Sequence, residues 1–361
     1  MMFADAANPR TPGPRKPSAV SPIGEIITDI REGRMIILMD DEDRENEGDI
    51  VVAAEKITPE QINFMLKHAR GLICLPMTGE RLDALGVRMM VAENTAPLGT
   101  AFTVSIDSLH CEGSGLSARD RARTVRDVLR EGCVGSDFRT PGHVFPLRSR
   151  DGGVLVRTGQ TEGAVDLARL AGLEAAGVIC EILNDDGTMA RLPEIVCFAK
   201  EHSLKIATIA DLIQYRLQTE SLVRLVASAR LPTRYGGEFT VHVYGSSVED
   251  GEHLVLVKGA IDPEKPVLVR AHAEYVPGDV FACIHRNTAS VLHRSMERIA
   301  QEECGVVLYI RRQGRGANML AEGEQGEVTT NPAARLAAFK DYGLGAQILR
   351  DLGVRKLRLL T

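Results

Sequence analysis

The sequence predicts an α/β fold in two successive units, a layered mixed sheet followed by a second α/β unit. Short apolar runs alternate with segments of helical periodicity as far as residue 217. A polar stretch with Pro232 and the pair Gly236-Gly237 then precedes a second series of strand-like segments. At roughly 100 to 200 residues per domain, a chain of 361 residues has room for both. We predict a disordered leader over 1–20, a first domain over 21–217, a linker over 218–237 and a second domain over 238–361.

Periodicity and turn signals define the individual elements. The first helix is marked by isoleucines at helical spacing, namely Ile23, Ile26, Ile27 and Ile30. Thr58-Pro59-x-Gln61 is a capping box that opens a helix ending at Gly71, and Ser117-x-x-Asp120 opens another. Further helices are expected over 161–171, 193–202 and 208–217. Strands are expected over 35–39, 50–54, 72–75, 101–106, 154–157 and 177–182, and in the second domain over 238–244, 253–258 and 266–272.

Composition excludes several classes of protein. A net charge of -6 opposes nucleic-acid binding, which needs a basic face. No window approaches 18 consecutive apolar residues, and the first twenty residues lack the apolar core of a secretory signal, so we expect a cytoplasmic protein without membrane contact. The seven cysteines are odd in number and contain no C-x-x-C, which argues against a disulfide framework or a zinc ribbon.

The segment from Asp40 to Asp49 is the most informative part of the sequence. It holds seven acids and one arginine directly after an apolar strand. Such carboxylates repel one another unless a cation or hydrogen-bond donors offset them, which favours Mg²⁺ or Mn²⁺ bound by oxygen ligands. An EF-hand is excluded because Asn46 stands where that loop needs glycine. A solvated charged loop is the alternative.

Several motifs in order carry a family resemblance over roughly residues 23 to 216. They are DDEDRENEGD, GLICLP, RTPGHVFPLR, RTGQTEG and GVICEILNDDGTMAR. Together they resemble 3,4-dihydroxy-2-butanone-4-phosphate synthase, an enzyme of riboflavin biosynthesis. The resemblance implies conversion of D-ribulose 5-phosphate to 3,4-dihydroxy-2-butanone 4-phosphate and formate, with Mg²⁺ or Mn²⁺ stabilising enediolate oxygens.

The resemblance also implies roles for individual residues. Catalytic or pocket-lining roles fall on Asp40, Glu47, Cys74, His143 and Glu181. Substrate contacts fall on Arg44, Asp49, Ser114, Arg157 and Thr161, with the last two holding phosphate. Metal binding falls on Glu45 and Gln160. In the family the histidine matching His143 enters the site from the partner, so a homodimer is expected.

Residue by residue, structural alternatives remain open. Glu181 suits a paired structural acid, His143 suits a turn cap, and Cys74 suits a small core residue. Arg157 suits a surface ion pair.

The sequence departs from the family at two places in the expected site. Gln160 replaces the metal-binding histidine, and a neutral amide oxygen is a weaker ligand. Gly113-Ser114-Gly115 replaces Thr-Thr-Gly. A synthase is the interpretation that the intact acid set favours; the alternatives are a paralogue with partial or related isomerase or dehydratase chemistry on another sugar phosphate, or a non-catalytic partner protein.

The second domain resembles GTP cyclohydrolase II through HLVLVKG, VRAHAEYVPGDVF, VVLYIRRQGRGA and DYGLGAQILRDLGVRKLRLLT. The family's three zinc cysteines match Tyr275, Arg286 and Thr288, none a usual zinc ligand, and Cys283 lies two residues off the spacing. Its catalytic Asp-x-Arg reads Ala338-Phe339-Lys340. We therefore expect a degenerate domain without zinc or GTP hydrolysis, in which Arg311 and Arg315 remain as phosphate contacts or structural pairs.

Overall fold

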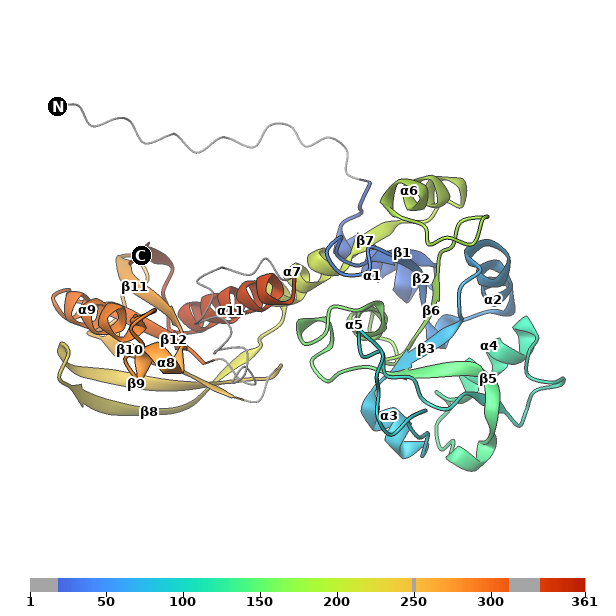
Figure 1. Ribbon diagram of the computed structural model, residues 1–361, viewed down its shortest axis with the longest axis horizontal. Helices are drawn as coiled ribbons and strands as arrows, with labels where there is room; N and C mark the ends of the chain where they lie inside the picture. The colour runs from blue at the N-terminus through green and yellow to red at the C-terminus, as the bar shows by residue number, and fades with distance from the viewer. Residues whose placement is uncertain (1–18, 249–250, 312–331, 361) are drawn as a thin grey trace. The chain divides into compact units, whose positions relative to one another are not determined.

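The computed structural model describes residues 19–248, 251–311 and 332–360, and for 332–340 only the backbone (Figure 1). The contacts divide the chain into two compact units. The first contains the described residues up to Asp41, 46–149 and 163–211, and the second contains 42–45, 150–162 and the described residues from Leu212 onward. Each unit has its own mixed sheet, so the α/β prediction is confirmed.

The first unit is built on a seven-stranded sheet in the order β4-β5-β3-β6-β2-β1-β7. Its strands are β1 (Ile36–Met39), β2 (Gly48–Ala53), β3 (Cys74–Met77), β4 (Ile106–Ser108), β5 (Phe138–Arg148), β6 (Gly177–Glu181) and β7 (Ile206–Thr208). Strands β1 and β2 are buried along their whole length, as expected for continuous apolar runs in a covered sheet. β2 pairs antiparallel with both β1 and β6, which brings Asp49 opposite Glu181.

Helices connect the strands of this sheet, and the last of them passes into the second unit. Up to β8 they are α1 (Ile23–Arg31), α2 (Pro59–Phe64), α3 (Gly79–Ala84), α4 (Ala118–Asp127), α5 (Gln160–Leu170), α6 (Leu192–Glu201) and α7 (Ile209–Thr219). The predicted capping box at Thr58 is present, with the Thr58 hydroxyl accepting from the Gln61 backbone N–H. The helix continues as the π-turn η2 (Met65–Ala69) and ends at Arg70, which adopts a left-handed conformation one residue before the expected stop.

Two predicted strands of the first domain are wrong in part or whole. The segment 154–157 forms a 3-10 turn, η4 (Gly153–Leu155), because Gly152 and Gly153 both have positive φ and reverse the chain there. In 101–106, Phe102 and Thr103 form only isolated bridges, and the strand proper, β4, begins at Ile106. The long strand β5 was missed, because Pro141 and Gly142 inside it read as a turn.

The second unit is built on a six-stranded sheet in the order β13-β11-β12-β10-β9-β8. Its strands are β8 (Val223–Thr233), β9 (Gly237–Ser246), β10 (Glu252–Lys258), β11 (Pro266–Ala273), β12 (Gly305–Ile310) and β13 (Lys356–Leu359). Its helices are α8 (Val276–Asp279), α9 (Thr288–Ala300) and α11 (Pro332–Asp351). β11 is parallel to β12 and β13, so the carboxyl ends of three strands share one edge.

The expected linker over 218–237 is wrong for most of its length. Residues 223–233 form the edge strand β8, which pairs antiparallel with β9. Nearly all of β8 is exposed, and its sequence mixes Arg224, Arg230 and Pro232 with apolar residues without the strict alternation of a half-buried strand. The predicted leader over 1–20 lies almost wholly outside the described residues; Val20 at its end bridges to Ile206.

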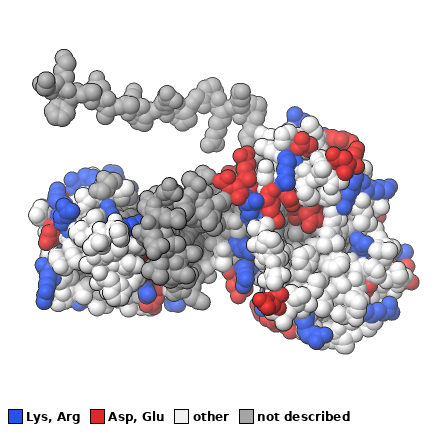
Figure 2. All heavy atoms as spheres, viewed as in Figure 1, with Lys and Arg blue, Asp and Glu red and all other residues white. Residues whose placement is uncertain are grey.

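Among the described residues, no helix combines the length and the apolar character needed to cross a membrane. Acidic and basic side chains lie beside one another on the face of the first unit shown in Figure 2. This mixture is typical of a water-exposed protein surface.

Candidate functional site

The acidic segment connects the hairpin strands β1 and β2 and is closed by its own hydrogen bonds. The Asp40 N–H donates to the Glu47 carbonyl (3.2 Å), and the Glu47 N–H donates to Asp40 Oδ1 (2.9 Å). Arg191 donates to the Asn46 carbonyl (2.8 Å) and pairs with the Glu47 carboxylate (3.6 Å). Backbone donors and one arginine therefore offset part of the repulsion in this segment.

The two predicted metal ligands converge on one position. Arg44 Nη1 donates to Glu45 Oε2 (2.5 Å) and to Gln160 Oε1 (3.2 Å). Gln160 is buried and Glu45 is about one-third exposed. Two oxygens that share one cationic nitrogen form a donor set suited to a hard cation, so Glu45 and Gln160 fit the ion that the sequence implies. In the described part of the chain, no three His, Cys, Asp or Glu side chains form a group that could hold a metal ion.

Three further predicted residues meet in the first unit. Asp49 on β2 lies opposite Glu181 on β6, and Glu181 Oε2 accepts from the Leu72 N–H (2.8 Å). Cys74 on β3 is buried, and burial, followed by the charges of Glu181 and Asp49, raises the pKa of its thiol. Paired carboxylates of this kind suit proton transfer, whereas the Cys74 thiol stays neutral at physiological pH.

His143 is held by a carboxylate that sequence reasoning missed. Asp107, the middle residue of β4, accepts from the His143 ring Nδ1 (2.7 Å) and from the His143 backbone N–H (2.9 Å). The Asp107 side chain is only 6% exposed and the His143 side chain 39%. A buried acid after an apolar strand was the signal that could have identified Asp107, and it orients the imidazole in the manner of a base-orienting group.

The loop carrying Ser114 is anchored by two acids. Asp120 accepts from the backbone N–H groups of Glu112 (3.1 Å), Gly113 (3.4 Å) and Gly115 (3.3 Å). Gly115 has positive φ, and a Cβ there would overlap the Asp107 carboxylate. These contacts fix the backbone of the loop beside the Asp107–His143 pair. Ser114 itself is exposed on this loop.

The predicted phosphate residues lie in the second unit, around the start of α5. Thr161 is buried in its first turn. Arg157 Nη1 pairs with Glu162 Oε2 (2.6 Å), and Glu162 also accepts from the Arg150 N–H (3.0 Å). An anion at this helix start has the partial positive charge of the helix N-terminus available in addition to Arg157.

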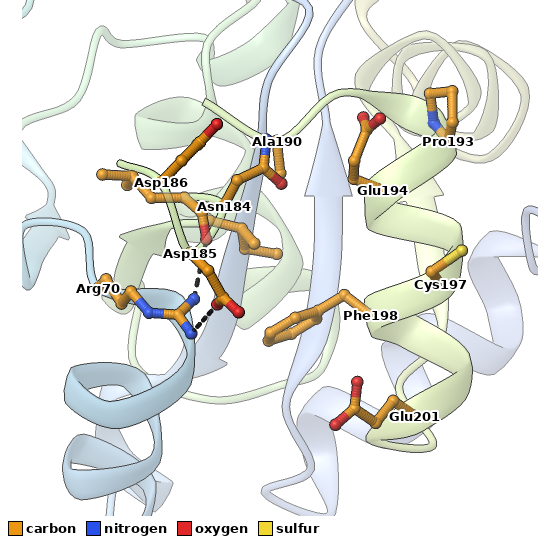
Figure 3. Close-up of a pocket in the computed structure, with 12 residues that line it drawn as sticks. Arg70, Asn184, Asp185, Asp186, Ala190, Pro193, Glu194, Cys197, Phe198 and Glu201 are labelled. Atoms are coloured by element: carbon orange, nitrogen blue, oxygen red, sulfur yellow. Dashed lines mark hydrogen bonds and ion pairs between the residues drawn. The ribbon is translucent and has the colours of Figure 1, made fainter. Parts of the chain in front are cut away.

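A separate cavity of about 580 Å³ opens in the first unit between α6 and the segment that follows β6. Figure 3 shows Phe198 pointing across it toward Arg70 and Asp185, which form an ion pair. Its lining residues include none of the predicted site residues.

In the second unit, the three residues that match zinc ligands lie around a hydrogen-bonded aspartate. The Arg286 guanidinium lies 4.7 Å from the centre of the Tyr275 ring. Asp279 accepts from Thr288 Oγ1 (2.5 Å), Tyr309 Oη (2.8 Å), His272 Nε2 (2.9 Å) and the Tyr275 N–H (2.9 Å). Burial opposes ionisation of Asp279, but these hydrogen bonds lower its pKa. The three matching positions supply a phenol, a guanidinium and a hydroxyl, none of which is a usual zinc ligand.

Other predicted residues of this unit are only partly described. Arg311 Nε pairs with Glu274 (3.5 Å), as the structural alternative expected. Arg315 lies outside the described residues. Ala338-Phe339-Lys340 lies in α11, where only the backbone is described.

We predict that Cys74 resists alkylation in the folded protein because its thiol is buried and its pKa is raised. Iodoacetamide at pH 8 should modify the exposed Cys197 and leave Cys74 unmodified, whereas both should react in urea. Peptide mass spectrometry measures both sites in one sample. Rapid modification of Cys74 under native conditions would contradict the burial described above.

Comparisons with known proteins cover both units. Residues 24–215 match the model of the 3,4-dihydroxy-2-butanone 4-phosphate synthase family, and residues 224–361 match that of GTP cyclohydrolase II. The riboflavin biosynthesis protein RibBA of Aquifex aeolicus is 52% identical over 94% of this chain and 86% of its own length. A 3,4-dihydroxy-2-butanone 4-phosphate synthase of Neisseria meningitidis serogroup A is 49% identical over 95% of this chain and 93% of its own.

Solved structures agree with these matches. The crystal structure of RibBX from A. baumannii, a two-domain 3,4-dihydroxy-2-butanone 4-phosphate synthase, has a TM-score of 0.78 at 41% identity and covers 94% of each chain. A 3,4-dihydroxy-2-butanone 4-phosphate synthase in complex with two magnesium ions has a TM-score of 0.54 at 43% identity, over 55% of this chain and 98% of its own. The chain therefore belongs to the 3,4-dihydroxy-2-butanone 4-phosphate synthase family and carries a GTP cyclohydrolase II domain after its synthase domain.

Proposed function

We propose that the chain converts D-ribulose 5-phosphate to 3,4-dihydroxy-2-butanone 4-phosphate and formate, with Mg²⁺ or Mn²⁺ as cofactor. The observation that carries the proposal is the convergence of Glu45 Oε2 and Gln160 Oε1 on one cationic position. The solved relative that holds two magnesium ions supports the choice of metal. The five carbons of the substrate are divided between a four-carbon product and formate, so the reaction needs no further co-reactant.

Each role follows from the chemistry of a side chain. Glu45 and Gln160 would hold the ion, and the ion supplies Lewis-acid stabilisation of enediolate oxygens. Asp49 and Glu181 lie opposite each other and would exchange protons with the substrate carbons and hydroxyls. Asp107 fixes the ring of His143, so that Nε2 is the nitrogen left to act on substrate.

Anchoring of the substrate is assigned to groups that suit an anion and hydroxyls. Arg157 and Thr161 would bind the phosphate at the start of α5, where the helix dipole adds to the arginine charge. Arg44 and Ser114 would bind sugar oxygens. We also propose a homodimer in which His143 serves the partner's site, which the partial exposure of its ring supports.

The Glu45→Gln variant tests the metal assignment. It removes the only charge of the ligand pair, and we expect formate release to fall by roughly 100-fold or more. Formate is measured by an enzyme-coupled assay, with product mass, in Mg²⁺, in Mn²⁺ and in EDTA. Glu42→Gln, an exposed acid of the same segment, is the matched control and should stay within about twofold of wild type. Substrate loss without formate would instead identify the paralogue with different chemistry.

The Asp107→Asn variant tests the orientation of His143. The amide keeps one acceptor for the His143 backbone but loses the carboxylate that fixes the ring, so we expect kcat to fall roughly 10- to 100-fold with KM little changed. Asp83→Asn, an exposed acid paired with Arg148, should leave kcat unchanged. An Asp107→Asn enzyme with wild-type kcat would remove His143 orientation from the mechanism.

For the second domain we propose the absence of GTP cyclohydrolase II activity. Tyr275, Arg286 and Thr288 offer a cation and hydroxyls where zinc needs thiolates. GTP incubated with the protein and added Zn²⁺ should yield no formate, while ribulose 5-phosphate yields formate in the same preparation. Turnover of GTP would overturn this assignment.

A further inference from the structure

Arg121 on α4 is a partly buried cation without a partner. Its guanidinium makes no hydrogen bond and no ion pair with any residue that the structure describes, and its Nε is enclosed without an acceptor. The neighbouring Arg123 on the same helix pairs with Asp127 at 2.9 Å. The difference lies in the surroundings of Arg121, because both arginines belong to one regular helix.

The two acids beside Arg121, Asp107 and Asp120, form hydrogen bonds with other groups. Asp107 attracts it electrostatically, but both Asp107 oxygens accept from His143. The adjacent Asp120 donates its backbone N–H to Ser117 Oγ, and its carboxylate accepts from the backbone of the Ser114 loop. Arg121 therefore stands beside His143 and this loop with its charge uncompensated.

A partly buried cation without a hydrogen-bonded acid among the described residues is costly. Burial lowers the pKa of the Arg121 guanidinium, and the attraction of Asp107 opposes this only in part. Buried charges in proteins are ordinarily paired. An unpaired one beside catalytic groups is suited to a ligand that brings the missing negative charge.

We propose that Arg121 binds an anionic oxygen of the phosphosugar, beside His143 and the Ser114 loop. This inference rests on the proposed function. The oxygen belongs either to the phosphoryl group, present throughout the reaction, or to the enediolate, whose charge develops in the transition state. If Arg121 binds the phosphoryl group, its removal should raise KM. If it binds the enediolate, its removal should lower kcat, so steady-state kinetics distinguish the two.

The test uses the full chain with Arg121→Gln, Arg121→Lys and the control Arg126→Gln, which removes an exposed arginine from the same helix. We expect Arg121→Gln to lose roughly 10-fold or more in kcat/KM, Arg121→Lys to recover part of it, and the control to stay within about twofold of wild type. Thermal unfolding supplies a second readout. Without ligand, Arg121→Gln should melt no lower than wild type, because the removed charge had no partner.

Ligand-induced stabilisation completes the test. Inorganic phosphate, and ribulose 5-phosphate in EDTA, should raise the Tm of wild type and control, and at least one of these shifts should shrink in Arg121→Gln. Wild-type kcat/KM and wild-type shifts in Arg121→Gln would overturn the inference. A lowered Tm with lost activity that lysine fails to restore would overturn it too, by making Arg121 structural.

Failure of the proposed function gives a different result. In that case wild type itself releases no formate from ribulose 5-phosphate. The Tm shift that the phosphosugar produces then decides the Arg121 inference, since it depends on binding and not on turnover.

Discussion

Repulsion between carboxylates that the sheet forces together is the constraint on which the first unit depends. The antiparallel register of β2 and β6 sets Asp49 opposite Glu181, and the fold offsets their charge with the Leu72 N–H. The same charges act with burial to keep the Cys74 thiol neutral. Two carboxylates on paired strands are suited to moving several protons in sequence.

In the second unit a hydrogen-bonded hub occupies the region that matches a metal-binding loop. Asp279, at the end of α8, accepts from four donors on β11, β12, the residue before α8 and the first residue of α9, so it joins these segments. The ring of Tyr275 accepts the Arg286 cation at the same place. Hydrogen bonds and a cation–π contact between side chains therefore hold this loop.

The sequence allowed prediction of those features that depend on local pattern. β1 and β2 follow from continuous apolar runs, and the helix start at Thr58 follows from its capping box. Features that depend on tertiary contacts could not be predicted from the sequence. β5 carries Pro141 where its pairing with β4 shifts register, and such an irregularity cannot be inferred from local pattern. Asp107 follows an apolar run, but the sequence does not show that it pairs with a histidine 36 residues away.

The site residues divide in the same way. Glu45 and Gln160 were expected as ligands because a family motif covers them, yet their shared contact with Arg44 is a tertiary fact. Arg121 belongs to the motif Ser-Ala-Arg-Asp-Arg, which sequence reasoning used only as a helix start. What distinguishes it is the absence of a partner among the described residues, and such an absence is visible only once neighbouring side chains are placed.

Strand β8 has a consequence for how the protein behaves in a crowded solution. Eleven residues of open edge would template pairing between copies, but this edge carries Arg224, Arg230 and Pro232 and is interrupted by a bulge at Val226. The arginines repel the same edge of a second copy, and the proline lacks a backbone N–H donor. The bulge interrupts the regular hydrogen-bond spacing that a neighbouring strand would need. The same strand also exposes Leu225, Val226 and Leu231, so these three devices limit the self-association that its apolar side chains would otherwise favour.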